Sequence, residues 1–265
     1  RADPATIAAV RHQLGLDIPL PQQYLNFVKG VLHLDLGTSY FTKEPVLAAL
    51  TRSFQVTLKL ASLSFVFAVI IGITCGLIAA LHRGKWLDSS LMTLSIVGVS
   101  APSFWIAILL QIIFGLKLNL LPISGFDTPA AYILPGIALG VRYAGSIARI
   151  TRTSMLDVIK QDYIRTAKAK GVARFFIIFK HALRNALIPV ITYVGPMTAY
   201  ILTGSLVVET VFTIGGLGTK FVSSITNRDY TMIMATTIFL AILMVCATLI
   251  SDLIYKAVDP RISFE

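Results

Sequence analysis

Long runs of apolar residues, separated by short polar or basic loops, occupy this chain from residue 56 almost to its end. A helix needs about 20 mostly apolar residues to cross the hydrocarbon core of a membrane. Five runs meet this requirement and predict membrane spans at 56–81, 91–116, 132–150, 186–208 and 232–255. The pattern therefore predicts an all-α, polytopic membrane protein.

Prolines modify two of these predicted spans. Pro102 predicts a kink in the second, and Pro189 and Pro196 lie within the fourth. Membrane helices tolerate proline where neighbouring helices satisfy the backbone groups that the proline leaves free. We therefore keep five spans.

Composition supports the membrane assignment and locates the charge. The chain is 55% hydrophobic and 14% charged, with a mean hydropathy of +0.78, whereas a soluble domain carries about 25% charged residues. Nine basic and two acidic residues between Arg149 and Asn185 supply seven of the ten net positive charges. A basic loop between apolar runs marks the cytoplasmic side. This distribution argues against nucleic acid as a partner, which would need a basic face on a soluble fold.

The remaining loops give a consistent topology. With the basic loop inside, residues 82–90 and the tail after Tyr255 are also cytoplasmic. Residues 1–55, 117–131 and 209–230 are then external, and their net charges are +1, zero and zero. The inside loops are thus the basic ones, as the positive-inside rule requires.

The topology predicts two regions. Residues 1–55 form an extracytoplasmic segment of short helices packed on the membrane domain, and residues 56–265 form that domain. Its cytoplasmic loop covers about 149–185. Because residue 1 is external without a signal peptide, we expect a sixth, N-terminal helix to precede Arg1 and to be missing from this sequence.

The basic loop predicts a helix from about 154 to 170, then Gly171, then a second helix that enters the membrane. Glycine permits the positive φ at which one helix ends and the next leaves at an angle. Such an element could transmit movement from a cytoplasmic partner into the spans. Alternatively, it could be an amphipathic helix held at the surface by anionic lipid. The residues alone leave both readings open.

The same loop resembles that of binding-protein-dependent ABC importer permeases. Their general pattern is Glu-Ala-Ala, three residues, Gly, nine residues, then Ile-x-Leu-Pro. Ala167, Gly171 and Leu183 match it. The positions that depart from it are Arg165, Thr166, His181 and Arg184.

The departures agree with the peptide/nickel branch of that family. Its version reads Arg-Thr-Ala-x-Ala-Lys-Gly, then His-x-Leu-Arg-Asn-Ala-x-x-Pro, as this chain does at 165–171 and 181–189. Further matches extend over essentially the whole chain and include 14–17, 35–37, 149–155, 216–218, 227–230 and 259–261.

The resemblance implies a type I ABC importer transmembrane domain in a bacterial cell membrane. The loop around Gly171 would be a coupling helix, with boundaries near 168–175, seated in a cleft of a cytoplasmic ATPase. The implied ATPase-coupling residues are Arg165, Thr166, Ala167, Lys168, Ala169, Lys170, Gly171, Val172 and Arg174.

The implied partners are a second homologous permease, two ABC ATPase subunits, an extracytoplasmic solute-binding protein and membrane lipid. The chain itself would have no enzymatic activity and no cofactor, because ATP and Mg would be bound by the ATPases. The implied substrates are di- or oligopeptides, with nickel or a metal chelate and glutathione as alternatives within the branch.

Other charged positions give weaker predictions. Arg142 lies near the middle of a span, so it either lines the translocation path, snorkels or forms an internal ion pair. Glu209 and the run 227–230 are predicted to be external, where a binding protein would dock. The members of that run are Asn227, Arg228, Asp229 and Tyr230, and a structural turn is an equal alternative for them.

Sequence chemistry gives no support for catalysis. The four histidines are scattered over both predicted sides, Cys75 and Cys246 lie in apolar runs, and no Gly-Lys-Ser/Thr phosphate loop is present. An ion-coupled secondary transporter would typically show inverted repeats, and a membrane enzyme would need clustered ionisable residues at one face. Neither feature is visible, so both remain distant alternatives.

Overall fold

The computed structural model describes residues 3, 8, 11–12 and 15–258. These residues form helices and, apart from one isolated bridge between Thr38 and Pro45, no β-structure. The elements are α2 (Leu20–Leu32), α3 (Val46–Leu81), α4 (Trp86–Ser100), α5 (Ser103–Leu110), η1 (Gln111–Lys117), η2 (Pro129–Tyr132), α6 (Ile133–Val158), α7 (Asp162–Ala169), α8 (Arg174–Phe176), η3 (Ile177–Ala182), α9 (Leu183–Ala186), α10 (Ile188–Gly204), α11 (Leu206–Val211), α12 (Leu217–Thr226) and α13 (Tyr230–Val258). The family match at 259–261 and residues 1–2, 4–7, 9–10 and 13–14 of the predicted external segment lie outside the described residues.

Among the described residues, four uninterrupted helical stretches are long and apolar enough to cross a membrane. They are Val46–Leu81, Pro129–Val158, Ile188–Val211 and Tyr230–Leu253. The first begins ten residues before the predicted start at 56, so α3 takes up the end of the predicted external segment. The polytopic all-α prediction is confirmed.

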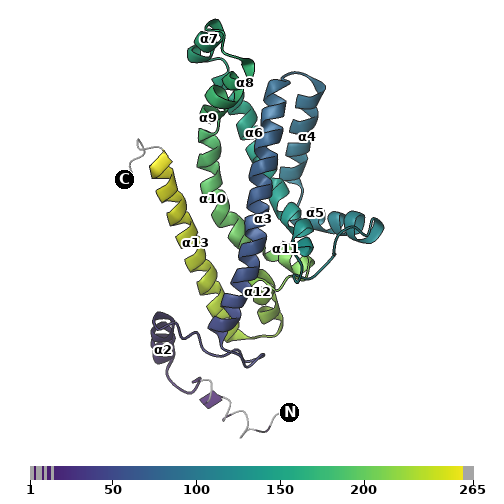
Figure 1. Cartoon of the computed structure of the whole chain (residues 1–265). Helices are drawn as coiled ribbons and strands as arrows, with labels where there is room; N and C mark the ends of the chain where they lie inside the picture. The colour runs from purple at the N-terminus through teal and green to yellow at the C-terminus, as the bar shows by residue number, and fades with distance from the viewer. Residues whose placement is uncertain (1–2, 4–7, 9–10, 13–14, 259–265) are drawn as a thin grey trace.

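The second predicted span, 91–116, is not one helix. It consists of α4 and the continuous stretch from Ser103 to Lys117, which are bent by 109° at the break after Ser100. Pro102 has no N–H to donate and Ala101 is extended, with φ −72° and ψ 134°. The predicted kink is therefore a sharp turn, and α5 and η1 leave the direction of α4 (Figure 1). The pair counts as a fifth span only if both helices are taken together.

The most extensive helix contact joins α3 and α6, followed by α4 with α6 and α10 with α13. Small residues make this close approach possible, as in other membrane helix pairs. A Cβ on Gly76 would lie 2.5 Å from the Ala148 carbonyl oxygen and 2.6 Å from Thr151 Cβ. Buried side chains of both helices, such as Leu60 and Ile147, complete this core.

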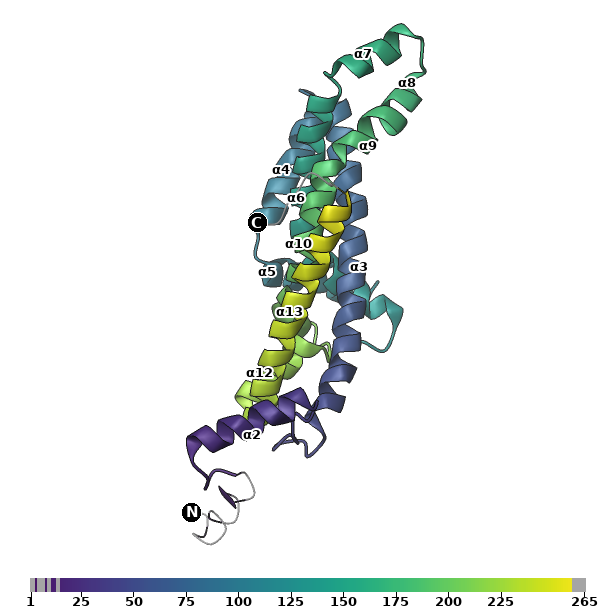
Figure 2. The ribbon, with the colours of Figure 1, turned by 90° about the vertical axis from the view of Figure 1, so that its left-hand side faces the viewer.

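The basic loop lies at one end of the bundle and α2 lies at the other (Figures 1 and 2). Gly171 and the described part of 1–55 are therefore separated by the length of the spans, as the loop charges predicted. The α3–α4 loop is at the α7 end, and α13 runs from the α2 end toward it. We refer to the α7 end as cytoplasmic and the α2 end as external on the charge argument.

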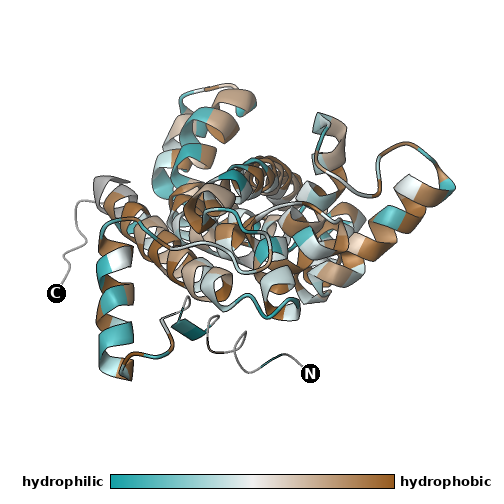
Figure 3. Ribbon diagram, turned by 90° about the horizontal axis from the view of Figure 1, so that it is seen from below, coloured by the Kyte–Doolittle hydropathy of each residue, from teal (hydrophilic) through white to brown (hydrophobic). Residues whose placement is uncertain are grey.

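The external segment meets the bundle through residues near the start of α3. Leu36, Val46 and Leu50 pack with Leu217 and Met232. In contrast, α2 has no buried residue, and polar and apolar positions alternate along it when the molecule is viewed from that end (Figure 3). The fully buried contacts of the segment thus come from residues after α2, whereas Phe27 and Val28 of α2 are half-buried.

Candidate functional site

The cytoplasmic loop is built around a short, exposed helix, α7. Gln161 is extended at its start, and Asp162 in the first turn and Lys168 in the last turn have charges that suit the helix dipole. Ile164 is its one buried residue and packs with the ends of α3 and α6 and with η3 through residues such as Met155 and Ile177. This anchor leaves the rest of α7 on the surface.

The predicted continuous helix from 154 to 170 is wrong. α6 continues to Val158, and a turn at Ile159–Gln161 separates it from α7. The estimated coupling helix 168–175 is also not one helix, because it includes the end of α7, a turn and the start of α8. The sequence contains neither glycine nor proline at this break to mark it.

Gly171 ends α7 in a left-handed turn. Its φ is +73°, its N–H donates to the Lys168 carbonyl oxygen at 3.0 Å, and Val172 N–H donates to the Ala167 carbonyl oxygen at 3.2 Å. These two bonds define a Schellman motif, in which the positive φ favours glycine. Val172 and Ala167 also pack on the same small core as Ile164. The predicted role of Gly171 as a helix end is thus present in the structure.

The predicted coupling residues form a mostly exposed surface. Ala167 and Val172 are half-buried, and the exposed members are Arg165, Thr166, Lys168, Ala169, Lys170, Gly171 and Arg174. Arg165 is 3.5 Å from Asp162, an exposed pair that contributes little. The structure brings these residues together on one protrusion (Figure 1).

Three phenylalanines beside this surface were missed. Phe175, Phe176 and Phe179 are 63%, 55% and 45% exposed, and the rings of Phe175 and Phe179 are 4.6 Å apart. An exposed apolar patch beside polar residues is typical of a surface that contacts a protein or a membrane. The run Arg-Phe-Phe-x-x-Phe at 174–179 was the available signal.

A groove runs between α6 and α10. Its two adjoining parts have volumes of about 500 and 710 Å³. Polar residues of α6 line it at intervals of three or four residues, which places them on one helix face. They are Arg142, Ser146, Arg149, Thr153 and Asp157.

The opposite wall of the groove comes from α10, through Pro189, Thr192, Tyr193, Pro196 and Tyr200. The face of α6 that points away from the groove packs against α3 and includes buried Ile147 and Thr151. The polar stripe is therefore a feature of the groove side of α6. Sequence reasoning identified Arg142 but missed the rest of the stripe, although its spacing was readable.

A third arginine of α6, Arg152, forms a structural ion pair with α4. The guanidinium of Arg152 donates to both oxygens of Asp88 in α4, at 2.5 and 2.7 Å. Asp88 is 4% exposed and also accepts from Gly84 N–H at 3.0 Å. Among the described residues, Arg142 and Arg149 have no such ion-pair partner. An internal structural pair for Arg142 is thus not present within this part of the chain.

Glu209 is not the surface residue that was predicted. It is fully buried and accepts hydrogen bonds from the Thr57 and Ser205 hydroxyls, at 2.7 and 2.8 Å. Gly218 N–H donates to its other oxygen at 2.7 Å. Thr57 in turn accepts from Leu217 N–H. Docking to a binding protein is wrong for this side chain, because its carboxylate is used to hold α3, α11 and α12 together.

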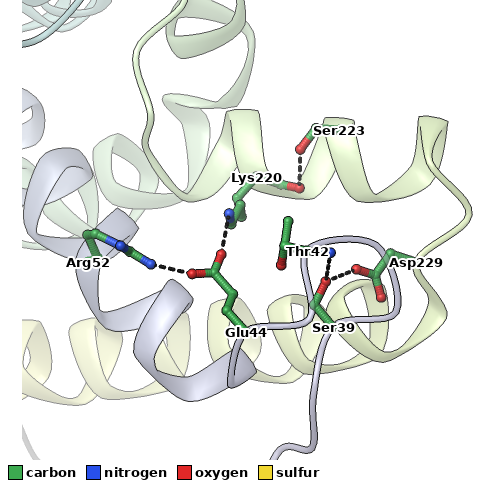
Figure 4. A network of polar contacts seen from close by, with 7 residues as sticks. All are labelled: Ser39, Thr42, Glu44, Arg52, Lys220, Ser223 and Asp229. Atoms are coloured by element: carbon green, nitrogen blue, oxygen red, sulfur yellow. Dashed lines mark hydrogen bonds and ion pairs between the residues drawn. The ribbon is translucent and has the colours of Figure 1, made fainter.

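The run 227–230 divides into one buried and three exposed residues. Asp229 is 3% exposed and accepts from the Ser39 hydroxyl at 2.5 Å and from Met232 N–H at 3.3 Å. It therefore caps α13 and binds the turn before α3 (Figure 4). The structural alternative fits Asp229, and docking is wrong for it. The exposed members are Asn227, Arg228 and Tyr230.

An ion-pair network lies beside this cap. Glu44 is 2.6 Å from Arg52 and 3.3 Å from Lys220 of α12 (Figure 4). Burial works to raise the pKa of the Glu44 carboxyl, but the hydrogen bonds from Arg52 and Lys220 outweigh it and lower the pKa below its usual value. The network joins the start of α3 to α12 at the external end.

The described residues contain no group of three or more His, Cys, Asp or Glu that could hold a metal ion. The geometry they offer is instead that of a transport protein, with a polar groove between spans and an exposed cytoplasmic helix.

Comparison with protein families decides the identification. The sequence profile described as "Binding-protein-dependent transport system inner membrane component" matches residues 72–264, and the profile of its N-terminal part matches residues 1–61. The chain belongs to this permease family. It is a multi-pass inner-membrane permease of a binding-protein-dependent ABC importer.

Two relatives illustrate the branch within this permease family. The chain is 43% identical to the glutathione transport system permease protein GsiC of Pectobacterium atrosepticum over 264 residues, which cover 100% of this chain and 86% of the relative. It is 46% identical to the dipeptide transport system permease protein DppB of Bacillus subtilis, over 94% and 82% of the two chains. The peptide branch of the family is therefore confirmed.

Solved structures agree with the permease fold. A chain of the MetNI methionine ABC transporter in an inward-facing conformation superposes with a TM-score of 0.65, covering 80% of this permease and 97% of that chain at 21% identity. A chain of an amino acid ABC transporter gives a TM-score of 0.57 at 16% identity, covering 87% and 98%. At these identities the likeness concerns the fold alone.

Proposed function

We propose that this permease forms the translocation path for di- or oligopeptides that an external solute-binding protein delivers, and that ATP hydrolysis in partner subunits drives the transport. The observation that carries the proposal is its 43–46% identity, over at least 94% of the chain, to permeases named for glutathione and for dipeptides. Glutathione is itself a tripeptide, so both names indicate a peptide backbone with a free carboxylate as substrate.

The proposed coupling element is α7 with the turn at Gly171. The buried Ile164 side chain anchors α7, and the Schellman motif ends it. Both features keep the direction of α7 fixed relative to α3 and α6. A cleft of an ATPase that closes around it would therefore move the membrane helices. Lys168, Lys170 and Arg174 provide basic contacts, and the phenylalanines at 175 and 176 provide apolar ones.

The proposed path is the groove between α6 and α10. Pro129–Val158 spans 30 residues, and Arg142 lies near its middle. A charged side chain at that depth is costly in contact with lipid, so such residues face a bundle interior or water. A second homologous permease would cover this side and enclose the path. The complete transporter then contains two permeases, two ATPase subunits and the binding protein.

Cysteine accessibility tests the path. In a background without Cys75 and Cys246, we expect Thr153→Cys to react rapidly with a membrane-impermeant thiol reagent added from the cytoplasmic side of the intact complex. Thr153 is exposed and lines the groove, so the thiol would be in water. Ile242→Cys on α13 is the matched control, because that side chain is 55% exposed within a continuous apolar helix. Equal labelling of both positions, or none at Thr153→Cys, would contradict the path.

Substrate choice is tested by uptake into proteoliposomes that contain the complete complex. We expect a dipeptide or oligopeptide to compete with the labelled substrate, and nickel or a nickel chelate not to compete. If glutathione competes but other peptides do not, the glutathione alternative is supported. Uptake driven by an ion gradient without ATP would instead support a secondary transporter.

A further inference from the structure

The groove contains two arginines arranged as a pair along one helix face. Arg142 and Arg149 are seven residues apart, which is two helical turns or about 10.5 Å along α6. Both line the same groove, Arg142 in one of its two parts and Arg149 in the other, and Ser146 lines both parts. Arg142 lies near the middle of the 30-residue span Pro129–Val158, and Arg149 lies two turns nearer its cytoplasmic end.

Within the described part of the chain, the guanidinium groups of Arg142 and Arg149 are free to bind an anionic group of a ligand, in contrast to that of Arg152. Arg152, one turn from Arg149, is satisfied by a bidentate pair with Asp88, whereas neither groove arginine has an ion pair among the described residues. A guanidinium group presents a planar fork of donors that matches a carboxylate or phosphate. Peptides of the proposed substrate class carry one such group at the C-terminus.

We propose that Arg142 and Arg149 form two successive binding positions for the C-terminal carboxylate of the transported peptide, so that the permease itself selects for this group. The inference rests on the proposed function and names a chemical requirement within the same path. Tyr193 and Tyr200 across the groove offer aromatic surfaces and hydroxyls to the rest of the peptide.

The charge order along the groove fits passage toward the cytoplasm. Asp157 is the one acidic residue that lines either part, and it lies two turns beyond Arg149 at the cytoplasmic end. Transport requires binding that is strong enough for entry and weak enough for release. A carboxylate that leaves Arg149 meets this like charge, which opposes retention inside the path.

Matched peptides that differ only at the C-terminus test the site. Uptake of one peptide as the free acid and as the C-terminal amide is measured in proteoliposomes containing the complete complex, at concentrations that saturate the binding protein. We expect the wild type to prefer the acid and Arg142→Ala to reduce the acid-to-amide ratio about tenfold, since a hydrogen bond to a charged group changes an equilibrium by this order. The binding protein is the same in both complexes, so its own preference cancels in the comparison.

Two further variants make the result specific. Lys59→Ala also removes a basic residue from a span, but Lys59 does not line the groove. The acid-to-amide uptake ratio of the Lys59→Ala complex should therefore equal that of the wild type. Arg142→Lys keeps the charge without the planar fork and should give an intermediate ratio, which preserves the test if Arg142→Ala fails to assemble.

Failure of the carboxylate site and failure of the proposed function would give different results. If Arg142→Ala lowers uptake of acid and amide equally, the role of the arginine is structural and the substrate site is overturned. An unchanged ratio in both Arg142 variants overturns it as well. If the wild type shows no ATP-driven uptake of either peptide, the proposed function itself is wrong.

Discussion

In a Gly171→Val complex, loaded binding protein should no longer stimulate ATP hydrolysis, and peptide uptake should fall to its level without ATP. The left-handed φ of +73° at this position costs a β-branched residue roughly 1–2 kcal/mol. A Cβ would meet nothing within 4 Å, so the effect comes from the backbone alone. Relief of that strain would extend or redirect α7 and misalign it with the ATPase. The measurement is binding-protein-stimulated ATPase activity in lipid.

The chain offers a closely matched control at Gly84. Its φ is also +73°, it too has open space around a Cβ, and it lies in the α3–α4 loop at the same end of the bundle (Figure 1). Gly84→Val should therefore cost similar stability but retain stimulation. If both variants behave like the wild type, α7 is a lipid-facing amphipathic helix and the coupling assignment is wrong.

Replacement of Glu209 should give the largest loss of stability of any single change discussed. All its partners donate to it, namely the Thr57 and Ser205 hydroxyls and the N–H groups of Gly218 and Thr219. Glu209→Gln keeps the shape, but if its amide oxygen accepts from Gly218 N–H, its NH₂ faces the two hydroxyls, whose own protons then lose the carboxylate as acceptor. Each buried donor left without an acceptor costs about 1–3 kcal/mol.

We expect Glu209→Gln to lower the unfolding temperature of the purified complex and to reduce the yield of assembled permease, and Glu209→Ala to do the same. Thr210→Ala is the matched control, because Thr210 is the next residue of α11 and is exposed. A Glu209→Gln complex as stable as the wild type, with altered affinity only for the binding protein, would restore the docking interpretation.

The apolar spacing predicted most of the fold because membrane solvation imposes one strong rule on length and hydropathy. Four spans follow from it directly. The 109° bend between α4 and α5 was underestimated, since proline at 102 specifies a break but not its angle. The angle depends on which helices the freed segment meets, as when Gln111 donates to the Ile123 and Val211 carbonyl oxygens.

Among the site residues, those with a local conformational role could be predicted, and those with distant partners could not. Gly171 could be identified because a helix end needs a local conformation that one residue type provides. Glu209 could not, since its partners Thr57 and Gly218 are distant in sequence or belong to another element. The predicted position of Glu209 at the external end suggested that its side chain is exposed, whereas the fold buries its carboxylate completely.

The central claim is that ATP, bound outside this chain, drives peptide transport through it. The most direct measurement is uptake of a labelled peptide by proteoliposomes that hold both permeases and both ATPases, with binding protein added to the external face. The account predicts uptake only when ATP and Mg are present on the ATPase side and binding protein is present on the other, with no effect of collapsing ion gradients. Uptake that continues without ATP and stops when an ion gradient is collapsed would contradict it.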